Sequence, residues 1–315
     1  MQDLIKLLKK SSMAKLRHFE LNPSTPDDKA PKTPGLKEGW EGILPSLGEA
    51  RLFLDTYEEK MIQERLDHYG ITEGVKAIGI NKIRVQMNTT DSDFQHLLLY
   101  SEDPPLTVPF AEITLHKGMF ATKAPFAEKL HDKTIPMLFV HWLKLQNPFT
   151  EEFQAGKPKM PGQSRPGLGI SKKVMEMLIV LSEKLGTEGL ANTPEYPHNA
   201  IFYSSRFLYL NPESEGMLRA LKRDLVGLSL ADFSWGIILG CVIDSKTGKL
   251  FEWFKEEQIL PLGGTLSSYF RSRSYSVDVS VSESAHKYEI DIEKLKTLPR
   301  EIPGDLLDPG NIVIR

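Results

Sequence analysis

The chain has 315 residues, and because one domain commonly holds about 100–200 residues, its length predicts two domains or one domain with long appendages. Its 39 basic and 42 acidic residues give a net charge of −3, which argues against a dedicated nucleic-acid binder, since such proteins carry a basic surface. The single cysteine, Cys241, excludes an internal disulfide and a cysteine-based zinc cluster. With no secretory signal and no stretch near the about 20 apolar residues of a membrane span, we expect a soluble, cytoplasmic protein that does not bind membranes.

The first 46 residues are expected to form a flexible arm. A short amphipathic stretch opens the chain, and residues 22–39 are then poor in large apolar side chains. Such a composition buries too little surface to offset the entropy of ordering. Four prolines lie in this part: Pro23, Pro26, Pro31 and Pro34.

The next segment predicts a helix followed by strands. From residue 47 the apolar residues fall at helical spacing, and Gly70 follows as a stop. Residues 96–100, 110–115 and 136–145 read as strands separated by proline and glycine. The third is apolar on both faces for most of its length, so we expect a central strand covered on two sides.

Helix and strand alternate in the following segment. Residues 171–185 carry a helical apolar stripe that ends at Gly186. A strand at 189–191, a helix at 199–206 and a strand at 207–210 follow. This order predicts a layered α/β fold.

The last hundred residues differ in character and predict an additional C-terminal α+β extension or small second domain at 213–315. Residues 214–225 read as a helix, and 239–254 as a hairpin that turns at 244–248. Residues 274–282 alternate apolar residues with serines, which predicts a half-buried strand.

A glycine-containing loop leads directly into the helix at 171–185. Gly167 and Gly169 allow close approach to the backbone, and a helix N-terminus offers free N–H groups and partial positive charge. Lys172 and Lys173 lie in the first turn, where cations oppose the helix dipole, so a bound phosphate would stabilise them.

The loop also has a purely structural explanation. The glycines can serve a tight turn into a helix capped by Ser171, with the lysines in solvent. Three better-known motifs are absent: the phosphate-binding G-x-x-x-x-G-K-[ST], the nucleophile elbow G-x-S-x-G, and the dinucleotide motif G-x-G-x-x-G. The remaining match is a coenzyme with a pyrophosphate.

Strand 137–145, loop 167–169, helix 171–185 and segment 199–203 together resemble the GNAT superfamily of N-acetyltransferases. The resemblance covers roughly residues 95–212 and implies a mixed sheet flanked by helices in an acyl-CoA-binding domain at 47–212. Acetyl-CoA or another acyl-CoA would be the cosubstrate. Its pantetheine arm would pair with the strand at Leu143 and Leu145. The resemblance implies these further coenzyme contacts: Ser164, Arg165, Gly167, Leu168, Gly169, Ile170 and Asn199.

Three residues are candidates for catalysis. The resemblance implies that Tyr203 faces the departing sulfur, and a phenol is a suitable acid for a thiolate. His141, on the central strand, is the candidate general base, with Glu112 on the neighbouring strand as reserve. Each has an ordinary alternative: a core tyrosine, a buried histidine and a solvated carboxylate. His198 and Asn199 are expected to cap the helix that follows them.

The resulting functional prediction is an acyl-CoA-dependent N-acyltransferase acting on a small-molecule or peptide amine, with no metal. The alternative is a catalytically inactive GNAT-like binding or interaction module. A third possibility, a nucleic-acid binder that uses the N-terminal lysines with Arg271 and Arg273, is disfavoured by the overall charge.

Overall fold

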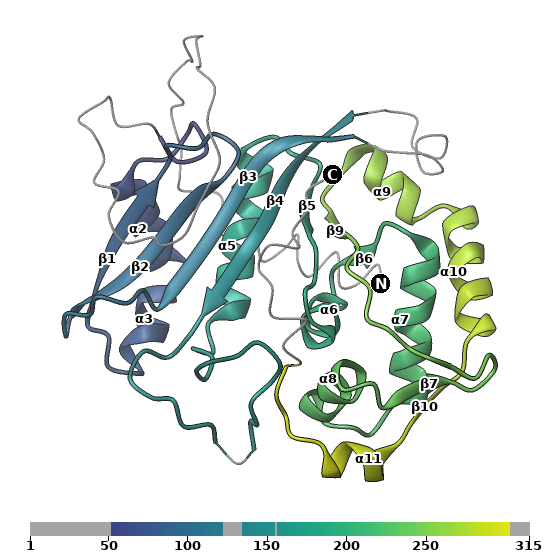
Figure 1. Ribbon diagram of the computed structural model, residues 1–315. Coiled ribbons are helices and arrows are strands. Elements are labelled where there is room, and N and C mark those ends of the chain that lie inside the picture. Colours follow the sequence, from purple (N-terminus) through teal and green to yellow (C-terminus); the bar gives the residue numbers. More distant parts are fainter. Residues whose placement is uncertain (1–51, 122–133, 155, 303–315) are drawn as a thin grey trace.

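A computed structural model describes residues 52–121, 134–154 and 156–302 of the chain (Figure 1). The expected arm at residues 1–46 lies outside the described residues. None of the helices described is both long and apolar enough to cross a membrane.

A seven-stranded mixed sheet organises the described residues, in the order β1-β2-β3-β4-β5-β9-β6. All neighbouring strands are antiparallel except β4 and β5, which run parallel. Helices flank this sheet, which confirms the layered α/β class. The strands are β1 Lys82–Asn88, β2 Gln95–Asp103, β3 Ala111–Ala121, β4 Thr134–Leu145, β5 Gly189–Asn192, β6 Leu208–Tyr209 and β9 Gln258–Pro261.

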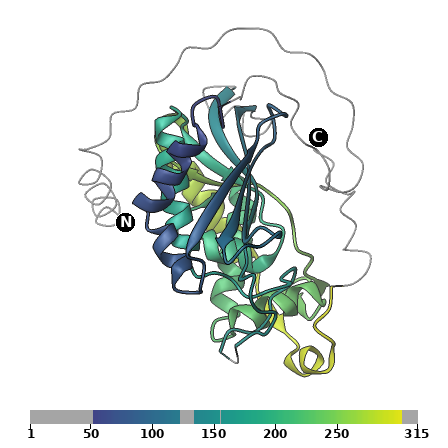
Figure 2. The same ribbon diagram turned by 90° about the vertical axis from the view of Figure 1, so that its left-hand side faces the viewer.

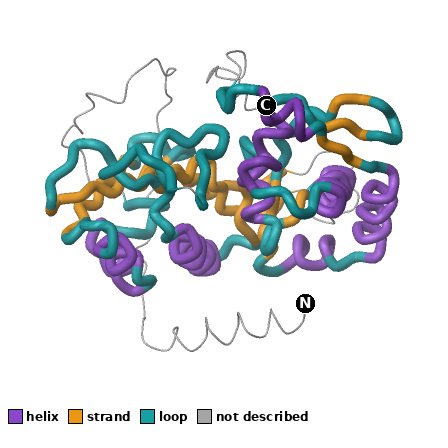
Figure 3. The backbone as a smooth tube through the Cα atoms, turned by 90° about the horizontal axis from the view of Figure 1, so that it is seen from below, coloured by secondary structure: helices purple, strands orange, loops and turns teal. Residues whose placement is uncertain are grey.

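Helices α2 (Glu59–His68), α3 (Ile71–Lys76) and α5 (Ser171–Lys184) cover one face of strands β1 to β4, as Figures 2 and 3 show. The strands turn alternate apolar side chains toward these helices and form the largest hydrophobic cluster with them. The opposite face carries polar and aromatic residues and is open at His141 and Trp142.

The first helix is shorter than its apolar spacing predicts. It begins at Glu59, whereas Leu54 and Tyr57 precede it in a turn closed by a bridge between Phe53 and Tyr57. Both side chains are buried nonetheless. Gly70 follows α2 with a φ of 66°, the left-handed conformation that its role as a stop requires.

Most predicted elements between residues 95 and 225 are present. The expected strands at 96–100 and 110–115 are confirmed, as are the helix at 171–185 and the elements up to α6 (Pro197–Tyr203) and α7 (Pro212–Asp224). For β4 the expectation of two covered faces is right only for its first half. Met137 and Leu138, which point to opposite faces, are buried, but His141 and Trp142 are exposed.

The C-terminal residues complete the sheet instead of standing apart from it. Strand β9 lies between β5 and β6, so the boundary expected at residue 212 runs through one sheet. The predicted hairpin is present as β7 and β8, and β10 joins it in a small second sheet. The remaining elements are α8 Leu230–Ile238, β7 Val242–Asp244, β8 Lys249–Leu250, α9 Gly264–Phe270, α10 Arg273–Ala285, β10 Tyr288–Ile290 and α11 Ile292–Thr297.

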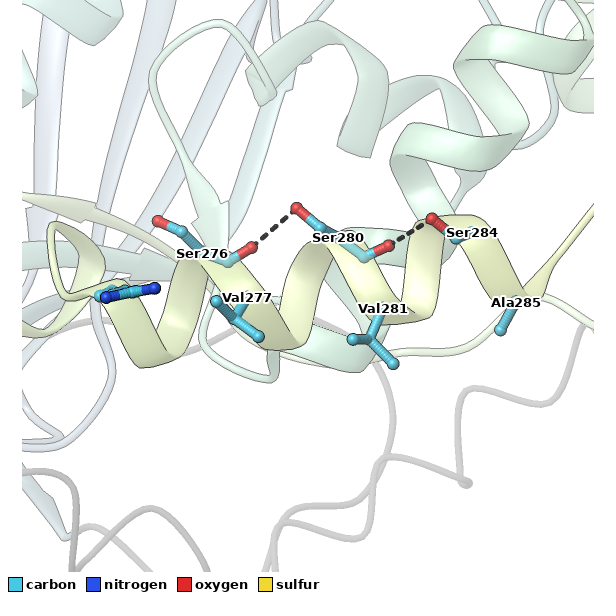
Figure 4. A pocket seen from close by; sticks show the side chains of 7 residues that line it. Ser276, Val277, Ser280, Val281, Ser284 and Ala285 are labelled. Atoms are coloured by element: carbon cyan, nitrogen blue, oxygen red, sulfur yellow. Dashed lines mark hydrogen bonds between the residues drawn. The ribbon is translucent and has the colours of Figure 1, made fainter.

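The strand predicted at residues 274–282 is wrong, because this segment belongs to helix α10. Tyr275, Val279 and Ser282 are its buried residues, at helical rather than alternating spacing. The hydroxyls of Ser280 and Ser284 each donate to the carbonyl four residues earlier, at 2.9 and 2.7 Å (Figure 4). Serine can therefore occupy the helix by bonding within it. Val277 and Val281 remain exposed in a shallow strip along this one helix.

Candidate functional site

Strand β4 has an unpaired edge in its second half. Its parallel pairing with β5 spans only Met137 to Val140. Among the described residues, no strand pairs with residues 141–145 on that side, and contact resumes only at an isolated bridge between Gln146 and Gly167. The two parallel strands thus separate from Val140 onward.

The backbone groups of Leu143 and Leu145 face this edge, and the carbonyl of Leu145 already lies against the glycine loop, 3.8 Å from where a Cβ atom of Gly167 would be. The N–H of Gln146 donates to the carbonyl of Phe110, toward β3. Because backbone polar groups alternate along a strand, Lys144 also faces β3, while Leu143 and Leu145 face the opposite side. These are the two residues at which pairing with a coenzyme arm is expected.

A β-bulge lies where the two strands separate. Thr114 is opposite Trp142 and Leu115 is opposite Val140, so His141 is an extra residue without a partner on β3. A bulge bends a strand and redirects its side chains. It leaves both His141 and Trp142 exposed on the face away from α5.

The glycine loop turns its backbone, not its side chains, toward solvent. Leu168 and Ile170 are buried, whereas Gly167 and Gly169 are exposed. Gly169 has a φ of 74°, and a Cβ atom there would meet nothing within 4 Å. Helix α5 begins at Ser171 without any side-chain cap, so the Ser171 cap of the purely structural explanation is absent. The loop therefore exposes backbone at Gly167 and Gly169, and the first N–H groups of α5 have no side-chain acceptor.

Most polar side chains around the loop form hydrogen bonds or ion pairs with neighbouring segments of the protein. Arg165 donates to the Pro148 carbonyl at 2.5 Å and pairs with Glu151 at 2.8 Å. Ser164 donates to the Gln146 side chain at 3.2 Å. The Lys173 ammonium donates to the Gly70 carbonyl at 2.7 Å, whereas Lys172 is exposed. Of these cations, only Lys172 is free of such a contact among the described residues.

Tyr203 packs against the same hydrophobic cluster as the β4 edge and the loop. Its ring lies 5.5 Å from each of the Phe202 and Phe207 rings, measured between centroids. Burial raises the pKa of the Tyr203 phenol to about 12, so the hydroxyl keeps its proton at neutral pH. The same shift makes the Tyr203 phenol a weaker acid than a free tyrosine.

His198 and Asn199 do not cap α6, contrary to expectation. The N-cap is Tyr196, and no side chain caps this helix. Asn199 lies inside its first turn, half-buried. His198 is buried and its Nδ1 lies 3.0 Å from the Ser234 hydroxyl in α8.

His141 lies among other rings on the open face. The Phe94 and Phe139 rings lie 4.8 and 6.1 Å away, and the stacked His116 ring lies 5.9 Å away. Their packing partly desolvates the imidazole, although the side chain remains exposed. That desolvation, with a smaller effect of charge on His116, lowers the pKa of His141 to about 4. His141 is neutral at pH 7.

Glu112 is held in an ion pair. Its carboxylate lies 2.9 Å from the Lys144 ammonium on the adjacent strand. The pair lies on the same open face as Trp142, because Glu112 and Thr114 alternate with the buried Ile113.

Sequence reasoning missed His116 and Phe94, which complete the surroundings of His141. Their approach depends on the β2–β3–β4 register and on the bulge, which no local pattern encodes. Among the described residues, no group of three or more His, Cys, Asp or Glu side chains is arranged to hold a metal ion. The sequence matches no protein-family model, and a search of curated proteins found no match.

Proposed function

We propose that the protein is an acyl-CoA-dependent N-acyltransferase that transfers an acyl group, acetyl in the simplest case, to an amine. The observation that carries the proposal is the β4 edge at Leu143, which pairs with no described strand, beside an uncapped helix start with exposed glycines. An extended arm carrying amides can add to such an edge as a strand does. A diphosphate suits the exposed loop amides. The strand–loop–helix order that resembles the GNAT superfamily supports the same assignment.

The reaction needs a free amine and a leaving thiol. The amine must lose a proton before its lone pair attacks the thioester carbonyl, and the C–S bond then breaks to release a thiolate. Tyr203 is the expected proton donor to this thiolate and would regain a proton from solvent, and its raised pKa makes this transfer less favourable than from a free phenol. His141, neutral and exposed at the bulge, is the expected residue on the acceptor side.

One observation favours the alternative of a binding module without turnover. His141, the expected base, has a pKa of about 4, far below neutral pH. The carboxylate of Glu112, the reserve base, is occupied by the Lys144 ammonium at 2.9 Å. General bases work best with a pKa near the operating pH. Binding of acetyl-CoA without transfer to any amine is the outcome that selects this alternative.

Isothermal titration with acetyl-CoA tests the proposal. Gly167→Glu is the sharper variant, because Gly167 lacks the left-handed φ of Gly169 and its Cβ would meet only the Leu145 carbonyl oxygen, at 3.8 Å. The new carboxylate therefore tests the site without straining the fold. We expect wild-type binding and at least about a tenfold loss in the variant, since a like charge is placed beside the diphosphate.

Gly156→Glu is the matched control, because Gly156 is exposed and a Cβ at that position meets nothing within 4 Å. We expect wild-type affinity in this variant. Absence of wild-type binding at millimolar acetyl-CoA removes the acyltransferase proposal. Equal affinity in all three proteins places the coenzyme elsewhere.

A further inference from the structure

Four rings form a connected group on the open face of β3 and β4, and we call Phe94, His116, Phe139 and His141 the histidine platform. The His116 ring stacks on Phe139 at 5.5 Å and on His141 at 5.9 Å. Phe94 closes the group, at 4.8 Å from His141 and 6.4 Å from His116. His141 is exposed and the other three side chains are partly exposed, so a ligand can reach the ring faces.

The β3 strand makes room for this arrangement. A Cβ atom at Gly118 would lie 2.6 Å from His116 Nε2 and 2.7 Å from its Cε1. The His116 ring therefore lies along its own strand over Gly118, and only glycine leaves space for it. The bulge adds the second histidine, because it places His141 without a partner next to this ring.

The charges beside the platform are negative. The Asp93 carboxylate lies 3.9 Å from His116 Nε2, and Asp91 is in the same turn, where it accepts the N–H groups of Asp93 and Phe94. Glu112 is neutralised by Lys144. Lys117 pairs with Leu138, which is buried on the α5 face, so Lys117 belongs to the opposite side of the sheet.

Aromatic faces next to uncompensated carboxylates are a site for a cation. Resting on the function proposed above, we propose that the histidine platform is the acceptor site, that it binds a protonated primary amine, and that His116 rather than His141 takes the amine's proton.

The proton transfer involves only the ammonium, His116 and water. An N–H bond of the ammonium breaks, its electron pair stays on the amine nitrogen, and a ring nitrogen of His116 gains the proton. The lone pair is then free to attack the thioester carbonyl. Asp93 stabilises the imidazolium that forms, whereas His141 has no carboxylate within ion-pair distance among the described residues. His116 afterwards releases the proton to water.

Amine binding is tested without any coenzyme. Benzylamine carries an ammonium and an apolar ring, and benzyl alcohol is its uncharged counterpart. The histidine C2–H resonances are followed by NMR during both titrations. We expect benzylamine to shift the His116 and His141 resonances and benzyl alcohol to shift them at least about tenfold more weakly. Asp93→Asn, at an exposed position, is expected to reduce benzylamine affinity by about three- to tenfold without affecting folding.

The role of His116 is tested by the pH dependence of transfer. In His116→Asn we expect kcat/KM for benzylamine at pH 7 to fall by about 100-fold or more. The loss should shrink toward pH 10, where the amine sheds its proton unaided, and acetyl-CoA affinity should stay unchanged. His68→Asn, on the exposed side of α2, is the control and should behave as wild type.

The outcomes separate the two proposals. If acetyl-CoA fails to bind but benzylamine shifts the platform resonances, the acyltransferase assignment fails and the amine site stands. If acetyl-CoA binds and benzylamine shifts neither histidine, the platform is not the acceptor site. Transfer by His116→Asn within about threefold of wild type at pH 7, or no transfer by the wild type, overturns the proton role.

Discussion

At the scale of single residues, a close contact between α3 and the residue before α5 sets the position of the glycine loop. Gly74 in α3 is an example, since a Cβ there would lie 2.7 Å from Cγ2 of Ile170, the residue before α5 begins. Ile170 is buried, so its side chain has little room to move. The start of α5, and with it the glycine loop, is therefore positioned by contact with α3.

Gly74→Ala should destabilise the protein despite the better helix propensity of alanine. Propensity favours alanine by about 1 kcal/mol, but overpacking at a buried contact costs about 1–3 kcal/mol. We expect a net loss of about 1 kcal/mol in the free energy of unfolding, measured by urea denaturation. Gly156→Ala, where the added methyl meets nothing, should not lose stability. An unchanged urea midpoint for Gly74→Ala would show that the Ile170 side chain moves aside at little energetic cost.

His198 predicts a pH dependence of stability. Burial lowers its pKa to about 4 from the usual 6.5, so the folded protein holds it neutral while the unfolded chain protonates below pH 6.5. Stability from this residue is thus complete above pH 6.5 and falls as the pH drops toward 4. The difference between the folded and unfolded pKa values of His198 corresponds to about 3 kcal/mol in the free energy of unfolding.

The variant His198→Gln, which keeps a polar partner for Ser234 but does not titrate, should show a shallower decline over this window. Chemical denaturation of both proteins at pH 7, 6, 5 and 4 measures the difference. Parallel declines would mean that His198 is protonated in the folded state well above pH 4.

At the scale of elements, α10 shows where sequence patterns mislead. Residues 274–282 alternate as a strand does, but the buried set is Tyr275, Val279 and Ser282, and serine counts as polar in any periodicity. Elements with an uninterrupted apolar stripe were predictable, as α5 is to within one residue. The bulge at His141 and the place of β9 were not, because both depend on pairing with segments distant in sequence.

Two serines of α10 distinguish helix from strand by mutation. Ser280 is exposed and bonds within the helix, so Ser280→Ala should stabilise the protein by about 0.5 kcal/mol through helix propensity. Ser282 is buried and donates to the Glu213 carbonyl at 2.7 Å, so Ser282→Ala should cost about 1 kcal/mol. In a strand the two positions would share one face and respond alike. Thermal unfolding followed by circular dichroism measures the stability of both variants. Equal changes in stability for the two substitutions would contradict the helix.

At the scale of the whole molecule, one sheet joins the two parts that composition separates. Strand β9 pairs with β5 on one side and β6 on the other, and α9 and α10 pack on the face formed by the start of β4, by β5 and by β9. The residues that carry the candidate coenzyme site thus share a core with residues beyond 213. Such a core is expected to unfold in one step.

Ile259 tests this coupling, because it is fully buried in β9, far along the chain from β4. Ile259→Ala should lower the free energy of unfolding by about 2–5 kcal/mol, the usual cost of removing a large side chain from a core. Tryptophan fluorescence reports each half separately in variants that keep only Trp142 in β4 or only Trp235 in α8, with the other three tryptophans replaced by phenylalanine. If the sheet is one cooperative unit, the unfolding midpoints seen by both probes shift to the same lower denaturant concentration.

The control is Ile243→Ala, at an exposed position in β7, which should shift neither midpoint. A shift seen by Trp235 alone would mean that the C-terminal residues unfold as a separate domain, and the coenzyme site would then be independent of them.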